Sequence, residues 1–282
     1  MNLAPATPVL GPALLGLALL AGCGKTDSAA GGGGSIGDAA GSPSAGGGRS
    51  GGNDAGSGGS GAGSGGAAGC ATFELTDPQL DAAVRAELGL AAGTPYTQAN
   101  VAALVRVYAE QVQSLGGAEC LSTLSELRLA RSNVSDLSPL AGLSALRTLS
   151  NTEGPLTSIA PLVGLGELRA LVLKGTEVAD VSVVSHFTRL AQLNLAQTPV
   201  FDLSPLAELH ELTELDVSGT QTPDLSAIPA PASAAQQPCL YALGLSPSAV
   251  PSHVAALCAE GWVVSWSATS GEHGVCNGTC GK

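Results

Sequence analysis

Leucines and other apolar residues recur at a constant interval of 22 positions through the middle of the chain. The sequence divides without a gap at Leu124, Leu146, Leu168, Leu190 and Leu212. The shared pattern is L-x-x-L-x-L-x-x-[ST]-x-V-x-D-L-S-P-L-x-x-L, and the unit from Leu190 states it in full. A fixed period of this length predicts a solenoid, in which each unit forms one coil and its apolar positions point into a shared core.

Each unit is expected to contain one short strand and one return arc. The Leu-x-Leu step has the two-residue period of a strand, with both leucines on its buried face. In Ser138-Pro139 and Ser204-Pro205 a serine stands where a helix N-cap belongs and a proline where the first helical residue belongs. Each arc is therefore expected to hold a short helical turn.

The units differ from one another at a few positions. A weaker copy precedes the first full unit, with its apolar residues in the order Val105, Val107, Val112, Leu115, Ala118 and Leu121. In the second full unit Asn151 occupies an inward leucine position, and a buried polar side chain is unfavourable without hydrogen-bond partners. This unit is expected to be the poorest of the series.

The segment before the repeats predicts a small helical cap. Asp77 and Pro78 combine an N-cap with a proline at the first helical position, apolar residues follow at helical spacing, and Gly89 supplies a stop. Thr97 opens a second short helix. We therefore expect an N-terminal cap over residues 70–101 and the repeats over 102–229.

After Pro229 the register breaks, and a different kind of ending is expected. One degenerate coil follows, with Leu240, Leu243, Leu245 and Val250 as its apolar positions. The residues around Leu257 are helical in pattern, and residues 262–266 have the pattern of a final strand. Residues 230–282 are therefore interpreted as a degenerate repeat and a C-terminal cap.

The chain begins with a short apolar stretch that ends in small residues before a cysteine. Leu20-Ala21-Gly22-Cys23 resembles the bacterial lipobox, and the resemblance implies cleavage after residue 22 and acylation of Cys23. The n-region has no Lys or Arg, and an ordinary cleavable signal is the alternative. Gly24 follows the cysteine, which in lipoproteins of double-membrane bacteria implies sorting to the outer membrane, facing the periplasm or the surface.

Residues 23–69 are interpreted as the lipidated Cys23 followed by a disordered tether. Glycine, serine and alanine dominate this segment, and it has almost no side chain able to build a core. A random coil of this length spans roughly 35 to 40 Å. The folded part is thus expected to stand off the membrane.

The D-L-S-P-L arc and the five aligned units resemble the internalin-type bacterial leucine-rich repeats over residues 102–229. The resemblance implies a right-handed solenoid with parallel strands on the concave face and short 3-10 or helical turns on the convex face. It also implies a helical N-terminal cap. In that family an asparagine usually follows the strand; here Ser132, Thr176, Thr198 and Thr220 stand there, with Gly154 in one unit, so a weaker ladder is expected.

By the same family analogy a ligand would dock on the concave sheet. The candidate binding residues are Arg106, Tyr108, Arg128, Arg131, Lys174, Asn194, Glu214 and Asp216. This face runs from basic to acidic and has few of the aromatic anchors that dominate binding sites. A protein ligand is the expected partner and a polysaccharide the second possibility; the alternative is a structural envelope lipoprotein whose sheet is merely solvated.

Apart from Cys23 the chain has six cysteines, which in an exported protein suggests three disulfides. All six lie in or beside the expected caps. The pairings we favour among fifteen combinations are Cys70 with Cys120, Cys239 with Cys258, and Cys276 with Cys280. A metal site at His273, Cys276 and Cys280 is the less favoured alternative, so no metal or cofactor is expected.

The net charge of −12 repels phosphate backbones, which argues against nucleic acid as a partner. His186 and His210 fall at different places in their repeats, and no nucleophile, base and acid occur in a recognisable motif. Asp136, Asp180, Asp202 and Asp224 recur just before each turn, where capping is favoured over a calcium ladder. The expected function is recognition or adhesion, not catalysis.

Overall fold

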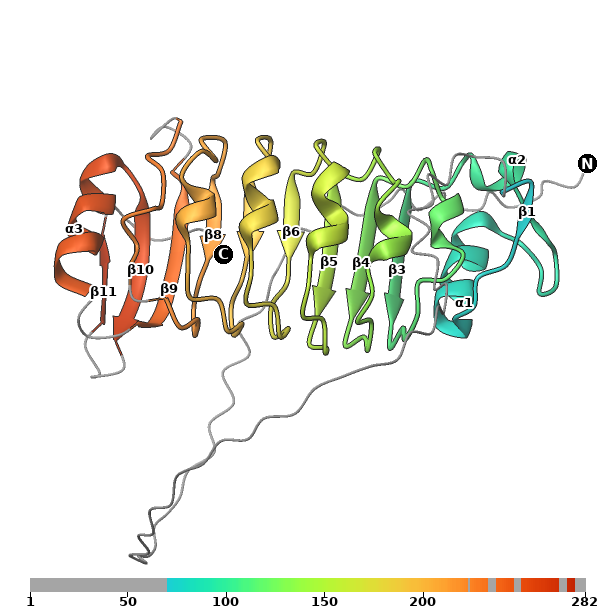
Figure 1. Cartoon of the computed structure of the whole chain (residues 1–282), viewed down its shortest axis with the longest axis horizontal. Helices are drawn as coiled ribbons and strands as arrows, with labels where there is room; N and C mark the ends of the chain where they lie inside the picture. Colours follow the sequence, from blue (N-terminus) through green and yellow to red (C-terminus); the bar gives the residue numbers. More distant parts are fainter. Residues whose placement is uncertain (1–69, 223, 233–236, 246–249, 269–272, 277–282) are drawn as a thin grey trace, which may run out of the picture. The chain divides into compact units, whose positions relative to one another are not determined.

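The computed structural model describes residues 70–222, 224–232, 237–245, 250–268 and 273–276. Its main element is a nine-stranded sheet in the order β11-β10-β9-β8-β7-β6-β5-β4-β3. The strands from β3 to β10 run parallel, and β11 is antiparallel to β10 (Figure 1). The strands are β3 (Arg106–Glu110), β4 (Glu126–Ala130), β5 (Thr148–Thr152), β6 (Ala170–Val172), β7 (Gln192–Asn194), β8 (Glu214–Asp216), β9 (Cys239–Leu245), β10 (Val263–Ala268) and β11 (His273–Cys276).

Strand pairing follows the 22-residue period and confirms the predicted coils. Leu127, Leu149, Leu171, Leu193 and Leu215 lie side by side in one inward column. Val107 and Leu240 extend this column at its two ends, and no member of it is more than 1% exposed. The aliphatic core is thus continuous from coil to coil, as expected for units that share their apolar face.

The first coil is shorter than the sequence pattern predicts. Val107, not Val105, pairs with Leu127, so β3 is shifted by two residues relative to the 22-residue period. Val105 is 54% exposed, and its prediction as an inward residue was wrong. A shift of two keeps every side chain on the same face of the sheet, since the pleat repeats every two residues. Arg106 and Tyr108 therefore remain outward.

Short 3-10 helices occupy the return arcs, as the Ser-Pro pairs indicated. They are η1 (Ala118–Cys120), η2 (Ser138–Leu140), η3 (Ala160–Gly164), η4 (Ser182–His186) and η5 (Ser204–Leu206). The serine is not the cap, however. In η2 the Oδ1 atom of Asp136 accepts the N–H of Ser138 at 2.8 Å. Asp180, Asp202 and Asp224 accept from Ser182, Ser204 and Ser226 in the same way. The aspartate thus caps the turn, because its carboxylate reaches a backbone donor two residues ahead.

Three of the four hydroxyl residues after the strands form bonds within their own coil. Thr176, Thr198 and Thr220 donate to the carbonyl oxygens of the residues three positions earlier, at 2.6–2.8 Å. They therefore fix the turn that follows each strand.

The N-terminal cap contains β1 (Thr72–Phe73), α1 (Pro78–Leu88), β2 (Tyr96–Thr97) and α2 (Gln98–Val101). Asp77 caps α1 and Gly89 ends it in a left-handed conformation, as predicted. Thr97 caps α2 in a reciprocal capping box with Asn100. Leu80 and Val84 of α1 are fully buried and belong to the same core cluster as the coils. The cap therefore covers the open end of the sheet at β3 (Figure 1).

At the other end, α3 (Val250–Glu260) and the strands β10 and β11 close the solenoid. Val254 and Leu257 of α3 join the core cluster with Trp262, whose indole N–H donates to the carbonyl of Pro229 at 3.0 Å. In β9, Leu240 and Ala242 point inward and Leu243 is 44% exposed. The sequence assigned Leu243 to the core, which was wrong because strand alternation places Ala242 there.

Two disulfides are present in the described residues, and one agrees with the sequence. Cys70 is bonded to Cys120 as expected. Cys258 is bonded to Cys276, so the pairings of Cys258 with Cys239 and of Cys276 with Cys280 were wrong. Cys258 and Cys276 both pack against the core, whereas Cys239 lies in an outward column beside Glu214. The Cys239 side chain thus faces away from α3, and Cys280 lies outside the described residues.

Candidate functional site

The outward side chains of the parallel strands form one continuous surface, which we call the strand face. Its middle column consists of Tyr108, Arg128, Ser150, Val172, Asn194, Asp216 and Tyr241, each paired in register with the next. Its first column runs from Arg106 through Glu126 and Gln192 to Glu214 and Cys239. The sheet thus brings side chains far apart in sequence to within one strand spacing, about 4.8 Å.

The structure places every predicted ligand-binding residue on this face or at its rim, and Cys23, the predicted lipidation site, lies outside the described residues. Arg106 and Tyr108 lie on β3, Arg128 on β4, Asn194 on β7, and Glu214 and Asp216 on β8. Arg131 and Lys174 follow β4 and β6 at the ends of the strands. Lys174 is partly exposed, and its carbonyl oxygen accepts the N–H of Glu153 at 2.9 Å.

The arginine-rich end of the strand face is electrically neutralised. Nε of Arg106 lies 3.3 Å from Oε1 of Glu87, and Nε of Arg128 lies 2.5 Å from Oε1 of Glu126. Arg131 forms an ion pair with Glu110. The expectation of a basic end was therefore incomplete, because each arginine pairs with a glutamate of the cap, of its own strand or of the preceding strand.

Tyr108 is the most exposed aromatic residue in the described part of the strand face, at 50%. The guanidinium carbon of Arg128 lies 5.6 Å from the centre of its ring, a distance that favours a cation–π contact. Partial burial and the neighbouring Glu126 raise the pKa of the Tyr108 hydroxyl. Tyr108 and Arg128 thus form a preorganised pair in the middle column.

The opposite end of the strand face is acidic, and amides are its partners. Oε2 of Glu214 accepts from Nε2 of Gln192 at 2.9 Å, and Oδ2 of Asp216 accepts from Nδ2 of Asn194 at 3.3 Å. Burial first, and then the charge of Asp216, raise the pKa of the Glu214 carboxyl. The amides of Gln192 and Asn194 donate hydrogen bonds to these two carboxylates, but they carry no charge and do not neutralise them.

Sequence reasoning missed several residues that shape this surface. Glu87 reaches Arg106 from α1, and only the folded position of the cap reveals the pair. Tyr241 continues the middle column after Asp216, but the insert after Pro229 conceals its register. The sequence could have revealed Glu110, because it stands at the end of β3 in the same position as Ala130 at the end of β4 and Thr152 at the end of β5.

The described residues contain no cluster of three or more His, Cys, Asp or Glu side chains arranged to bind a metal ion. Cys276, one donor of the alternative metal site, is bonded to Cys258. A cavity of about 270 Å³ in the N-terminal cap is lined by Asp81, Arg85 and Tyr96, among others. Asp81 and Arg85 pair at 2.8 Å, and the Tyr96 hydroxyl donates to Asp81, so this network joins α1 to β2.

Parallel coils at a 22-residue interval, 3-10 arcs and an outward strand face define a leucine-rich-repeat solenoid. Within that class the chain is similar to internalin-type leucine-rich-repeat proteins. Such solenoids serve as protein-interaction modules and are not typically enzymes.

Solved structures from Listeria monocytogenes support this assignment. An internalin (inlF) is 27% identical with a TM-score of 0.60, over 69% of this chain and 56% of that one. Internalin C2 is 25% identical with a TM-score of 0.52, over 68% of this chain and 94% of that one. The chain thus spans little more than half of the first of these proteins.

Comparison with protein-family models and with curated proteins gave no match. The two disulfides together with the internalin-type neighbours indicate an exported protein. Among the described residues, no helix has the length and apolar character needed to cross a membrane.

Proposed function

We propose that the chain is a lipid-anchored recognition module of the cell envelope, which binds a protein ligand through its strand face. Acylated Cys23 would hold it at the outer membrane, and residues 24–69 would separate the folded part from the bilayer. In this proposal residues 70–101 and 230–282 are caps that seal the repeats at 102–229. The caps leave the strand face available to a partner.

The observation that carries this proposal is the exposed Tyr108–Arg128 pair in the middle column of the strand face. Tyrosine and arginine are enriched among the residues that dominate protein interfaces, because they combine large contact area with directional hydrogen bonds. Polysaccharide sites rely more on stacked aromatic platforms, and here one exposed tyrosine stands among hydroxyls, amides and charges. A protein is therefore the favoured ligand.

A structural envelope lipoprotein without a specific ligand is the second candidate. The ion pairs of Arg106, Arg128 and Arg131 favour it, since side chains that are already satisfied gain less from a partner. In this role the strand face would be a solvated surface.

The two candidates are separated by capturing partners from the envelope fraction with matched variants. We expect Tyr108→Ala/Arg128→Ala to lose a captured protein that the unchanged chain retains. Phe201→Ala/Arg189→Ala is the control, because it removes an exposed aromatic residue and an ion-paired arginine outside the strand face. Equal capture by both variants would favour the structural role.

The anchor is tested separately from ligand binding. Cys23→Ala should abolish incorporation of labelled palmitate and release the protein from the membrane fraction. Retention of the label in this variant would contradict the proposed lipidation site. Protease treatment of intact cells then distinguishes a surface-facing protein from a periplasmic one.

A further inference from the structure

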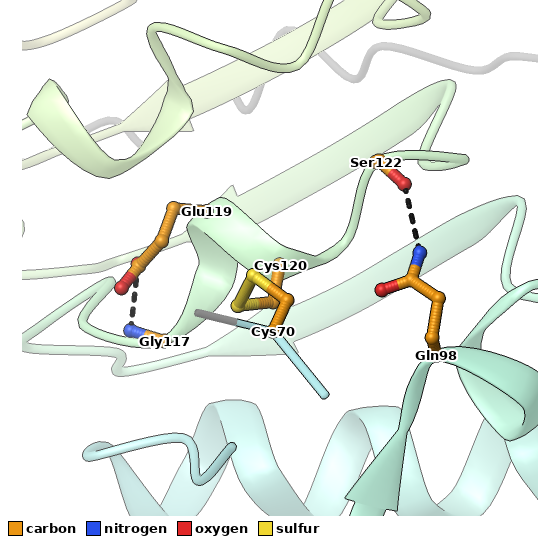
Figure 2. Close-up of a disulfide and its surroundings, with 6 residues drawn as sticks. All are labelled: Cys70, Gln98, Gly117, Glu119, Cys120 and Ser122. Atoms are coloured by element: carbon orange, nitrogen blue, oxygen red, sulfur yellow. Dashed lines mark hydrogen bonds between the residues drawn. A yellow bond between two sulfur atoms is a disulfide. The ribbon is translucent and has the colours of Figure 1, made fainter. Parts of the chain in front are cut away.

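One disulfide joins the start of the described chain to the first coil. Cys70 is bonded to Cys120 at the end of η1, with their Cα atoms 5.4 Å apart (Figure 2). Cys120 is only 5% exposed, so the bond is rooted in the buried part of the first return arc. The bond spans 50 positions and encloses every element of the N-terminal cap.

The segment that follows Cys70 is held to the rest of the cap by few contacts. β1 has two residues and pairs with the equally short β2, through Thr72 with Thr97 and Phe73 with Tyr96. The Phe73 and Tyr96 rings stack with their centres 5.2 Å apart. A two-residue ladder is a low-stability element, which opens before the packed coils do.

The remainder of the cap is joined to the first coil by the buried side chains of α1, which share its core, and by hydrogen bonds. The N–H of Thr76 donates to the carbonyl of Gly116 at 3.0 Å, and Oδ2 of Asp77 accepts from Gln113 at 2.8 Å. Nε2 of Gln98 donates to the Ser122 hydroxyl at 3.4 Å, beside the disulfide (Figure 2). A neutral bond of this kind contributes only about 0.5–1.5 kcal/mol net, and the bond to the Asp77 carboxylate about 1.5–3 kcal/mol. These contacts lie one after another along the chain, so they would break in succession if the chain were pulled at its start.

We propose that the Cys70–Cys120 disulfide is a mechanical clasp that keeps a pull on the preceding chain from reaching the N-terminal cap. Tension arriving at residue 70 passes through the two sulfur atoms directly into η1. Residues 71–119 then form a loop in parallel with the bond, and they bear none of the load while the bond is intact. The N-terminal cap therefore stays packed against β3, at the end of the inward column.

The source of such a pull is the one point at which this inference rests on the proposed function. A lipid anchor at one end and a bound partner on the strand face would place the chain between them under tension. Without the clasp, tension would first peel β1 and then α1 from the coils. The buried Val101, Leu104 and Val107 would then lose their cover.

The test is single-molecule pulling of the full chain through a short tag at each end, without membrane or ligand. In Cys70→Ser/Cys120→Ser we expect an added first event, at lower force than any event of the unchanged chain. It should release residues 71–101, roughly 110 Å of chain at ~3.5 Å per residue. The matched control Cys258→Ser/Cys276→Ser, which removes the other disulfide, should not gain this event.

An identical first event in the Cys70→Ser/Cys120→Ser variant and in the unchanged chain would overturn the proposal. If that variant does not fold, dithiothreitol is added to the folded chain already held in the trap, and the same early event is expected. Its absence there overturns the proposal equally. Because no anchor or partner takes part, this result is independent of the lipidation and capture experiments.

Discussion

Oδ2 of Asp77 accepts a hydrogen bond from the backbone N–H of Gln113 at 2.8 Å, across 36 positions of sequence. The other oxygen, Oδ1, accepts the N–H groups of Gln79 and Leu80 at the start of α1. One buried carboxylate thus caps a helix and joins the cap to the first coil. The sequence predicted only the first of these two roles.

Replacing Asp77 with alanine should therefore destabilise the protein more than the loss of an ordinary helix cap. Loss of the cap costs about 1 kcal/mol, and loss of the part-buried hydrogen bond between Gln113 and the charged carboxylate adds about 1.5–3 kcal/mol. We expect a total of roughly 2–4 kcal/mol in urea unfolding. Asp136→Ala, which removes an exposed turn cap, is the control; equal losses would show that the bond to Gln113 contributes nothing.

The buried pair of Ser132 and Asn151 predicts a stabilising double substitution. Both residues are fully buried, and Ser132 donates to Oδ1 of Asn151. Nδ2 of Asn151 has no hydrogen-bond partner within the described part of the chain. Replacing both groups with apolar ones removes this unpaired donor, so Ser132→Ala/Asn151→Leu should be more stable by about 1–3 kcal/mol.

The two single variants provide the check on this interpretation. Ser132→Ala alone leaves both polar groups of Asn151 unpaired, and it should lose about 1–3 kcal/mol. A double-mutant cycle by thermal unfolding measures the coupling between the two sites. Additive effects would show that the two side chains do not interact.

Acid should destabilise the return arcs in a way that depends on their aspartates. The N–H and hydroxyl of Ser182 hold the pKa of Asp180 below its ordinary value, and Ser226 does the same for Asp224. A carboxyl whose pKa is lowered by folding contributes stability above its unfolded pKa of about 3.9. That contribution is lost as the pH falls through the folded value.

Asp180→Asn/Asp224→Asn keeps two turn-capping oxygens and removes their charges. We expect this variant to show a shallower fall in melting temperature between about pH 4 and pH 2 than the unchanged chain. Glu208→Gln, at an exposed residue, serves as the charge control. The same slope in all three proteins would refute the assignment of the acid step to these turns.

Glu214 predicts the opposite pH dependence. Burial and the charge of Asp216 raise its pKa, so the folded chain binds the proton more tightly than the unfolded chain does. Its ionisation therefore removes stability as the pH rises from about 4.3, the unfolded value, through the folded pKa. Glu214→Gln should raise the melting temperature at pH 7 and leave it almost unchanged at pH 3. A lower melting temperature at pH 7 would contradict this reasoning.

Much of the fold follows from the sequence, because the inward leucines are locally periodic. The capping residues Asp77, Gly89 and Thr97 could also be predicted from local sequence, because each caps or ends a helix only a few positions away. The shift of β3 was not readable, because a change of two residues preserves the alternation of faces. Val105 and Val107 therefore fit the pattern equally well.

The strand face was predictable in outline and not in its interactions. Strand alternation determines that Tyr108, Arg128 and Asp216 point outward, whichever side chains surround them. The Arg106–Glu87 pair and the Cys258–Cys276 disulfide depend on how the caps fold back onto the coils. Such contacts arise from tertiary packing, which a repeat pattern does not encode.

The central claim is that a protein partner lies on the strand face, and photo-crosslinking in living cells tests it most directly. A photoreactive amino acid would replace Ser150, in the middle of the strand face, or Val163, which is 51% exposed on the return arc of the same coil. We predict a crosslinked protein adduct from position 150 and none from position 163. Adducts from position 163 alone, or from neither position, would contradict the account.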